Sequence, residues 1–171
     1  MNYIKGYKRK IIVLIITLLW MAVIFMFSNQ TGNSSSGISD KIVNGAIDIF
    51  VPKYDSMPSD EKKQIFSTLS LIVRKSAHMT EYAILAVLVY LFFLEKNWWF
   101  RYFLPVAFVM FYAATDEIHQ TFVSGRSGNV IDVGIDTLGA VLIMTLISIV
   151  HLIIKRIKKE KVNKVLHSEL F

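Results

Sequence analysis

The chain contains no cysteine. This absence excludes a disulfide framework, a zinc site built on thiolates and a cysteine nucleophile. Charged residues are also scarce: they make up 19% of the 171 residues, whereas 54% are hydrophobic. A soluble protein of this length needs a more polar surface than that. The composition therefore indicates an integral membrane protein, and the length predicts a single domain over residues 1–171.

Strong motifs for metal or nucleotide chemistry are also missing. No spacing of residues matches a zinc-metalloprotease helix or a phosphate-binding loop. We therefore expect neither a cofactor nor a bound metal, although the His and carboxylate residues described below leave a divalent metal open. The net charge is +6, but the basic residues flank apolar runs, where membrane proteins keep their cytoplasmic anchors. We expect the lipid bilayer as a partner and no nucleic acid.

Four long apolar runs are what the chain does contain. They predict transmembrane helices at about residues 11–28, 77–94, 98–115 and 133–154. Each run is close to the roughly 20 residues that a bilayer core requires. The first run follows basic residues, as the apolar part of a signal peptide does, but its length and the lack of a cleavage pattern favour a retained span. The sequence thus predicts an all-α fold, a membrane bundle of four helices.

The distribution of basic residues predicts how this bundle is oriented. Lys and Arg gather before the first run, between the second and third runs, and in the tail at 155–171. Because basic flanks stay in the cytoplasm, both termini are predicted to be cytoplasmic in a multi-pass protein. Residues 28–74 then form a long extracytoplasmic loop.

This outer loop has helical signals of its own. After a polar linker at 30–37, four apolar residues recur at helical spacing: Ile38, Ile42, Ala46 and Phe50. They predict a short amphipathic helix on the outer membrane surface. Further along, Ser59 precedes two acidic residues and is predicted to cap a second helix that leads into the second span. Simple packing of both helices over the span ends is the alternative.

Three groups of polar residues are predicted to lie at the outer end of the bundle. They are Arg74, His78 and Glu81 at the second span, Asp116, Glu117, His119 and Gln120 after the third, and Arg126, Asp132 and Asp136 around the start of the fourth. Charged groups in a membrane cost several kcal/mol unless they are paired or hydrated. We therefore expect the three groups to meet.

Three interpretations of this cluster remain open. It can be a structural knot, in which Arg74 and Arg126 neutralise carboxylates and interhelical hydrogen bonds hold the helices together. It can bind a ligand, with Arg126 presented by a glycine turn to a phosphate or carboxylate. In this reading the ligand-binding residues are Arg74, Glu117, Gln120, Arg126, Asp132 and Asp136. It can also be catalytic, with a His as general base oriented by a carboxylate. The catalytic candidates are then His78, Glu81, Asp116 and His119.

Two of these acidic residues have a simpler explanation. Asp132 and Asp136 open the fourth span, and acidic groups are favourable in the first turn of a helix. Asn129 is predicted to cap that turn.

The chain resembles the VanZ-like family, small bacterial membrane proteins whose namesake is associated with resistance to the glycopeptide teicoplanin. The resemblance rests on the end of the first span (FSNQ at 27–30), on RKSAHMTEY at 74–82, on TDEIHQTFVSGR at 115–126, and on Asp132, Asp136 and Gly139. It implies a Gram-positive cell-membrane protein that acts in envelope processes or antibiotic susceptibility. It implies no mechanism.

Three functional hypotheses follow. The first is an envelope factor without enzymatic activity, whose polar cluster binds a lipid-linked or peptidoglycan-derived ligand and lowers susceptibility to teicoplanin. The second is a membrane-embedded enzyme that modifies such a substrate, with His78 or His119 as the base. The third is a small transporter or the partner of one.

Overall fold

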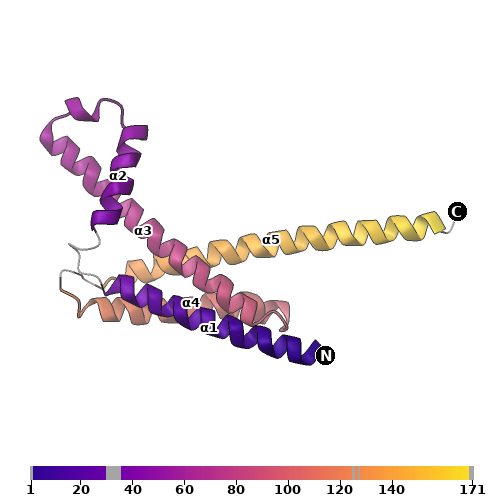
Figure 1. Ribbon diagram of the computed structural model, residues 1–171. Coiled ribbons are helices and arrows are strands. Elements are labelled where there is room, and N and C mark those ends of the chain that lie inside the picture. The colour runs from indigo at the N-terminus through magenta and orange to yellow at the C-terminus, as the bar shows by residue number, and fades with distance from the viewer. Residues whose placement is uncertain (1, 30–35, 125, 127, 170–171) are drawn as a thin grey trace.

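The structure is a computed structural model that describes residues 2–29, 36–124, 126 and 128–169. Over these residues the chain is all-helical and contains no strand, as the sequence predicts (Figure 1). The elements are α1 (Asn2–Ser28), α2 (Ser36–Phe50), the short 3-10 helix η1 (Tyr54–Ser56), α3 (Ser59–Phe92), α4 (Trp98–Gln120) and α5 (Val130–Glu169). Residues 30–35, most of the predicted polar linker, and positions 125 and 127 of the predicted glycine turn lie outside the described residues.

Four of the helices pack along one another and the fifth lies apart. Helix α3 contacts α1, α4 and α5, and α4 also packs on α5, whereas the main contact of α2 is with the N-terminal part of α3 (Figure 1). The α2–α3 hairpin projects from one end of the molecule, and α5 continues alone beyond the other end (Figure 1). Both chain ends extend toward the side opposite the hairpin.

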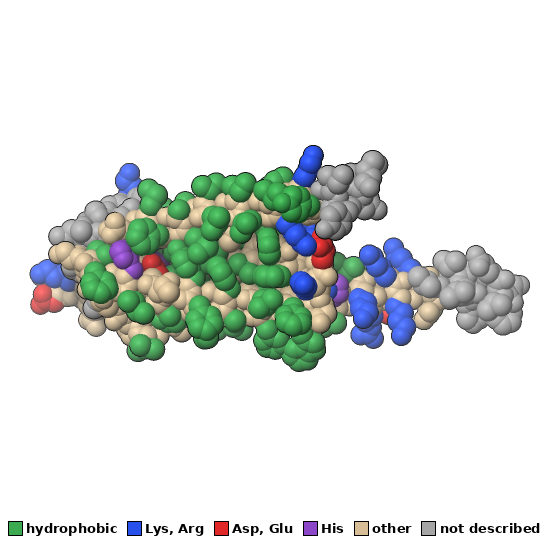
Figure 2. Space-filling model, turned by 90° about the horizontal axis from the view of Figure 1, so that it is seen from below, with side chains coloured by type: hydrophobic (Ala, Val, Ile, Leu, Met, Phe, Trp, Pro, Cys, Tyr) green, Lys and Arg blue, Asp and Glu red, His purple; other side chains and the backbone are tan. Residues whose placement is uncertain are grey.

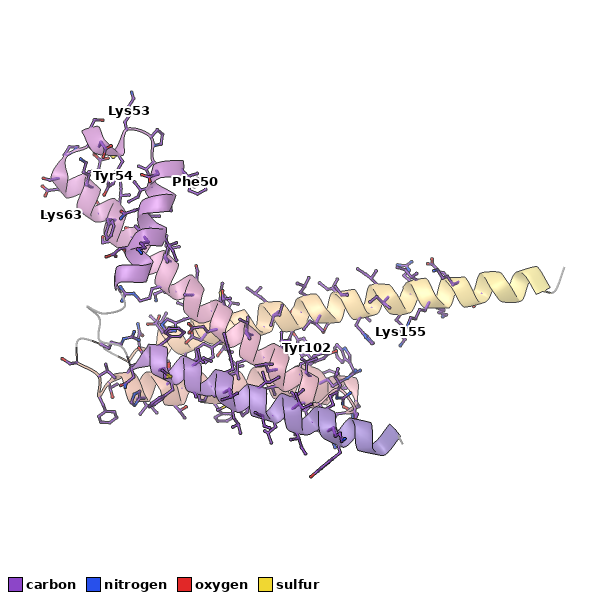
Figure 3. The ribbon with its side chains drawn as sticks, in the orientation of Figure 1. Phe50, Lys53, Tyr54, Lys63, Tyr102 and Lys155 are labelled. Atoms are coloured by element: carbon purple, nitrogen blue, oxygen red, sulfur yellow. The ribbon has the colours of Figure 1, made fainter. Side chains whose placement is uncertain are left out.

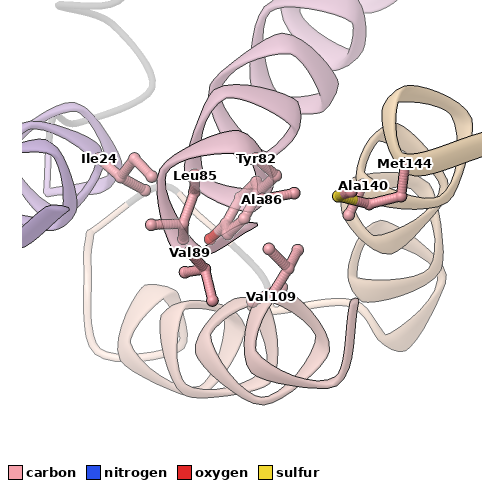
Figure 4. Packing of buried hydrophobic residues seen from close by; sticks show 9 residues of the cluster. Ile24, Tyr82, Leu85, Ala86, Val89, Val109, Ala140 and Met144 are labelled. Atoms are coloured by element: carbon pink, nitrogen blue, oxygen red, sulfur yellow. The ribbon is translucent and has the colours of Figure 1, made fainter. Parts of the chain in front are cut away.

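A small apolar core joins the four packed helices (Figure 4). Its buried members are Ile24 of α1, Tyr82, Leu85, Ala86 and Val89 of α3, Val109 and Ala113 of α4, and Ala140 and Met144 of α5. The α3 residues recur at intervals of three and four, which places them on one face of the helix. Two hydrogen bonds fix α1 against this core: Trp20 Nε1 donates to the Glu81 carbonyl at 2.9 Å, and the Tyr112 hydroxyl donates to the Met21 carbonyl at 2.7 Å.

Apolar side chains also cover much of the outside. Figure 2 shows them over the middle of the molecule, with Lys and Arg toward the end from which α5 projects. Two helices are long and apolar enough to cross a membrane, namely α1 over Gly6–Ser28 and α5 over Val130–Lys161. Among the described residues, the predicted spans at 77–94 and 98–115 do not meet the same criteria of length, hydropathy and low charge. Two apolar helices indicate membrane association, and the predicted four-span topology goes beyond what they establish.

The hairpin corrects two local predictions. Helix α3 runs without a break from Ser59 to Phe92, so the second outer helix and the second predicted span are one element. Pro58, not Ser59, occupies the N-cap position, although Asp60 and Glu61 lie in the first turn as predicted. Pro58 suits this position because a proline at a helix start sacrifices no intrahelical hydrogen bond.

The predicted apolar stripe of the amphipathic helix is not the one that packs on α3. Helix α2 exists as predicted, but its buried residues are Val43 and Ile47, whereas Ile42 and Phe50 are 53% and 77% exposed. Both stripes have helical spacing, so the choice between them depends on how α2 is rotated on α3.

The last two helices are longer than the predicted spans. Helix α4 continues past residue 115 to Gln120, and α5 continues past residue 154 through most of the basic tail. Pro105 lies inside α4 without ending it, as predicted, and the Asn97 side chain caps the helix start by accepting a hydrogen bond from the Phe100 amide at 3.1 Å.

Candidate functional site

A cavity of about 290 Å³ opens at the end of the bundle where α4 ends and α5 begins. The lining residues predicted from the sequence are Arg74, His78, Glu117, Gln120, Arg126, Asp132 and Asp136. The others are Leu71, Lys75, Asn129 and Ile135. Helices α3, α4 and α5 and the α4–α5 connection therefore bring members of all three polar groups together around one space.

The pairing of opposite charges differs from the prediction. Lys75 of α3, which was not predicted as a site residue, forms the ion pair with Asp132 of α5. Arg74 and Arg126, expected to neutralise carboxylates, have no carboxylate within ion-pair distance among the described residues. Arg126 makes one long contact, from Nη2 to the Phe27 carbonyl at 3.4 Å. Two guanidinium groups thus face the cavity without an acidic partner.

Burial and the neighbouring charges affect the pKa of Arg126. Its pKa lies below the ordinary value for arginine because burial disfavours the charged form and because the positive charge of Arg74 is close. Asp116, Glu117 and Glu81 act in the opposite direction. A guanidinium does not lose its proton in proteins, so burial and the charge of Arg74 act on a group that stays positive, and an anion between the two arginines would offset both.

Glu117 serves as a structural link across the α4–α5 connection. It is 7% exposed, and its Oε2 accepts the backbone N–H of Asn129 at 2.8 Å while its Oε1 accepts from the Gln120 amide at 3.2 Å. Burial raises its pKa above the usual range, and the Asn129 hydrogen bond partly offsets this. Because both carboxylate oxygens already have partners, Glu117 is less available to a ligand than the sequence predicts.

The start of α5 is capped as predicted. Asn129 Oδ1 accepts the backbone N–H of Ile131 at 3.0 Å, and the carboxylate of Glu117 lies against the same turn. A negative group at a helix N-terminus is favourable because the first backbone N–H groups point toward it. Asn129 also lines the cavity. The sequence predicted it only as a helix cap.

His78 and Glu81 form the pair that helical spacing predicts. His78 Nδ1 lies 3.4 Å from Glu81 Oε2, and the two side chains are mostly covered. His78 lines the cavity, whereas Glu81 does not. The nitrogen on the far side of the ring, Nε2, points away from this carboxylate. A carboxylate that contacts one ring nitrogen can orient the other for proton transfer.

Two further catalytic candidates lie behind the cavity wall. Asp116 is 4% exposed and accepts a hydrogen bond from the Gln120 amide at 3.1 Å. His119 instead faces α1, where its ring centroid lies 4.5 Å from that of Phe25. Gln120 therefore joins Asp116 to the cavity lining, but His119 is directed elsewhere. Within the described part of the chain, no group of three or more His, Asp or Glu side chains is placed to hold a metal ion.

A helical pattern in the sequence points to the lining residues of α3 that were not predicted. Leu71, Lys75 and His78 are spaced at intervals of four and three, so they share a helical face. The prediction considered Arg74, His78 and Glu81. Lys75, three residues before His78, and Leu71, three residues before Arg74, would have been found by including the other neighbours on that face.

The comparisons with known proteins agree with the motifs. The sequence model of the VanZ/LLP1 family matches residues 13–151, from within α1 to within α5. The chain belongs to the VanZ/LLP1 family. No curated protein and no solved structure matches this chain. The matched range of this VanZ/LLP1 member includes every residue that lines the cavity.

Proposed function

We propose that this VanZ/LLP1 protein is a single four-span domain of the Gram-positive cell membrane, with both termini in the cytoplasm and the cavity at the outer face. The exposed apolar side chains of α1 and α5 support a lipid-facing surface. At the end opposite the cavity, Arg9 Nη2 lies 2.9 Å from Glu95 Oε1, and Lys10 pairs with the same carboxylate. Glu95 has a lowered pKa chiefly because Lys10 donates to it. Basic groups at this end fit a cytoplasmic location.

The cavity in this proposal binds the anionic group of a lipid-linked or peptidoglycan-derived ligand. The observation that carries it is the pair Arg74 and Arg126, which line one cavity and have no carboxylate partner within the described part of the chain. Guanidinium groups bind phosphate and carboxylate oxygens through directed, charge-assisted hydrogen bonds. A cavity of about 290 Å³ is at the lower limit of ligand pockets, so it fits a headgroup while the lipid chains stay in the bilayer.

Such a site would lower susceptibility to teicoplanin. Teicoplanin carries a lipid tail that concentrates it at the outer leaflet, where a membrane protein that binds envelope intermediates competes with it. Vancomycin lacks that anchor. Expression of the protein in a susceptible Gram-positive host is therefore expected to raise the inhibitory concentration of teicoplanin more than that of vancomycin.

Charge-removing variants test whether the cavity is responsible. Arg126→Gln and Arg74→Gln are expected to abolish the teicoplanin effect at normal membrane levels of the protein, because each removes one of the two unpaired cations. Lys161→Gln removes an exposed positive charge from the tail and is the matched control. Unchanged teicoplanin susceptibility in cells that contain abundant wild-type protein would contradict the proposal.

The pair His78–Glu81 favours an enzymatic alternative, in which His78 acts as a general base on a lipid-linked substrate. Among the two histidines predicted for this role, only His78 lines the cavity. Lipid profiles of cells with and without the protein separate the two functions. A lipid-linked species that appears with the wild type and disappears with His78→Gln would favour catalysis, whereas an unchanged profile with intact resistance would favour binding.

A further inference from the structure

A second cleft lies at the other end of the bundle, where α4 and α5 meet the C-terminal part of α3. It is lined by Tyr90, Trp98, Arg101, Tyr102, Met144, Ile147, Ser148 and His151. Its free volume is only about 10 Å³, so a bound group would lie across its mouth rather than inside it. None of these lining residues is acidic, and none belongs to the outer cavity.

Arg101 gives this cleft an unused hydrogen-bond donor. Its Nη1 reaches the Leu94 carbonyl at 3.4 Å, while its buried Nε has no partner in the described part of the chain. A buried donor without a partner costs about 1–3 kcal/mol. An oxyanion across the mouth of the cleft would offset the charge of the Arg101 guanidinium, although the buried Nε itself lies out of its reach.

Further polar groups converge from α5. Ser148, His151 and Lys155 are spaced at intervals of three and four, which places them along one face of the helix. The first two line the cleft, and Lys155 lies one turn beyond it. In Figure 3, Lys155 projects from the side of α5 that is turned toward the end of the bundle where Tyr102 lies.

An aromatic wall completes the cleft on the α4 side. The rings of Trp98 and Tyr102 stack with centroids 5.7 Å apart, and Trp99 stacks on Phe103 at 5.0 Å. Tyr102 also joins the two helices, because its hydroxyl lies 3.2 Å from Thr145 Oγ1. Tryptophan and tyrosine concentrate at the depth of lipid headgroups. Arg101 therefore shares the cleft with the side chains expected where acyl chains meet headgroups.

We propose that this cleft, between α4 and α5, binds the phosphate headgroup of an anionic phospholipid in the cytoplasmic leaflet. Arg101 and Lys155 contact the phosphate oxygens, and Trp98 and Tyr102 contact the glycerol and the first methylenes of the lipid. Basic pockets between transmembrane helices on the cytoplasmic side are known to hold anionic headgroups. This site is separate from the outer cavity and does not depend on its ligand.

Binding of short-chain lipids to the detergent-solubilised protein tests the proposal. Dioctanoyl phosphatidylglycerol is expected to bind, whereas dioctanoyl phosphatidylcholine, which has no net charge, and inorganic phosphate, which has no chains, bind at least about fivefold more weakly. The measurement is made in the Arg74→Gln/Arg126→Gln double variant, so that the outer cavity contributes nothing. Equal binding of inorganic phosphate would overturn the lipid assignment, and equal binding of phosphatidylcholine would overturn the role of charge.

Two single variants locate the site on the surface. Lys155→Gln is expected to weaken phosphatidylglycerol binding about fivefold, because a lysine near a headgroup contributes on the order of 1 kcal/mol. Lys161→Gln removes the same charge from a different face of α5 and is expected to change binding less than about twofold. Arg101→Gln should weaken binding at least as much as Lys155→Gln. An equal loss in Lys155→Gln and Lys161→Gln would overturn the site and leave only diffuse attraction to the tail.

Discussion

At the residue scale, Gly139 determines how closely α5 approaches α3. A Cβ atom built at this position would lie 2.3 Å from the Met79 carbonyl oxygen and 3.1 Å from its carbonyl carbon. Both are backbone atoms and cannot rotate away, so a side chain at residue 139 forces the two helices apart. Met79 directly follows His78, and the same separation would displace one wall of the outer cavity.

Gly139→Ala is therefore expected to destabilise the protein by about 1–3 kcal/mol, the usual cost of overpacking. Gly134→Ala is the matched control on the same helix, because nothing lies within 4 Å of its added Cβ. That change should be neutral or stabilise α5 by up to about 1 kcal/mol, since alanine is the better helix former. Thermal unfolding of the two variants in detergent measures the difference. Equal melting temperatures would show that α3 and α5 are less closely packed than described.

The spacing of residues along the chain correctly predicted contacts within one helix or turn. It did not predict the contact between two helices. The pair His78–Glu81 and the Asn129 cap each lie within one or two turns of chain, so helical periodicity suffices to predict them. The ion pair Lys75–Asp132 joins α3 to α5. Arg74 and Lys75 are neighbours, and the rotation of both helices decides which of them reaches Asp132. No pattern within one helix contains that information.

At the element scale, the α2–α3 hairpin is held by a narrow apolar seam. Val43 and Ile47 are the buried residues of α2, at 0% and 3% exposed. The 3-10 turn that follows is held by Lys62, whose Nζ donates to the Asp55 carbonyl at 2.7 Å and lies 5.7 Å from the centre of the Tyr54 ring. Figure 3 labels Phe50, Lys53, Tyr54 and Lys63 around this tip.

Val43→Ala is expected to loosen α2 from α3 by about 1–3 kcal/mol, because it removes buried methyl groups from this seam. Hydrogen exchange of the α2 amides reports the change, at about tenfold in rate for every 1.4 kcal/mol. Ile42→Ala, at a position 53% exposed, should leave α2 exchange nearly unchanged. Faster exchange in Ile42→Ala than in Val43→Ala would show that the stripe with Ile42, and not the one with Val43, packs on α3.

The sequence predicted α2 but not its orientation. Its apolar residues form two overlapping stripes, and periodicity alone cannot choose between them. The contact with α3 makes the choice, and the side chains left outside, Ile42, Ile49 and Phe50, form the surface available to a membrane. The same dependence on tertiary contacts explains why the continuity of α3 through the predicted boundary at residue 77 was missed.

At the scale of the whole molecule, the proposed topology can be tested directly because the native chain has no cysteine. Asp55→Cys, in η1, should react with a membrane-impermeant maleimide on intact protoplasts. Asn97→Cys and Asn163→Cys should react only after permeabilisation, since both lie at the end proposed to be cytoplasmic. Labelling of residue 97 from outside would reverse the proposed orientation and place the outer cavity in the cytoplasm.

The presence of helices over the four apolar runs was the most predictable property, because long apolar runs need only composition and length to be found. The two middle helices show where this approach reaches its limit. Polar residues such as His78 and Glu81 lower the apolar character of α3; the two form a pair, of which His78 lines the cavity. The polar residues near the cavity thus weaken the same signal from which a membrane span is inferred.

The unbroken course of α3 has a mechanical consequence. Thirty-four residues in one helix form a rod about 50 Å long, with the α2 hairpin at one end and Arg74 and His78 near its middle. A stiff rod supported near its centre acts as a lever. A rigid tilt of this helix would therefore move the hairpin and the α3 wall of the cavity together. The shape of the cavity is thereby tied to events at the tip of the hairpin.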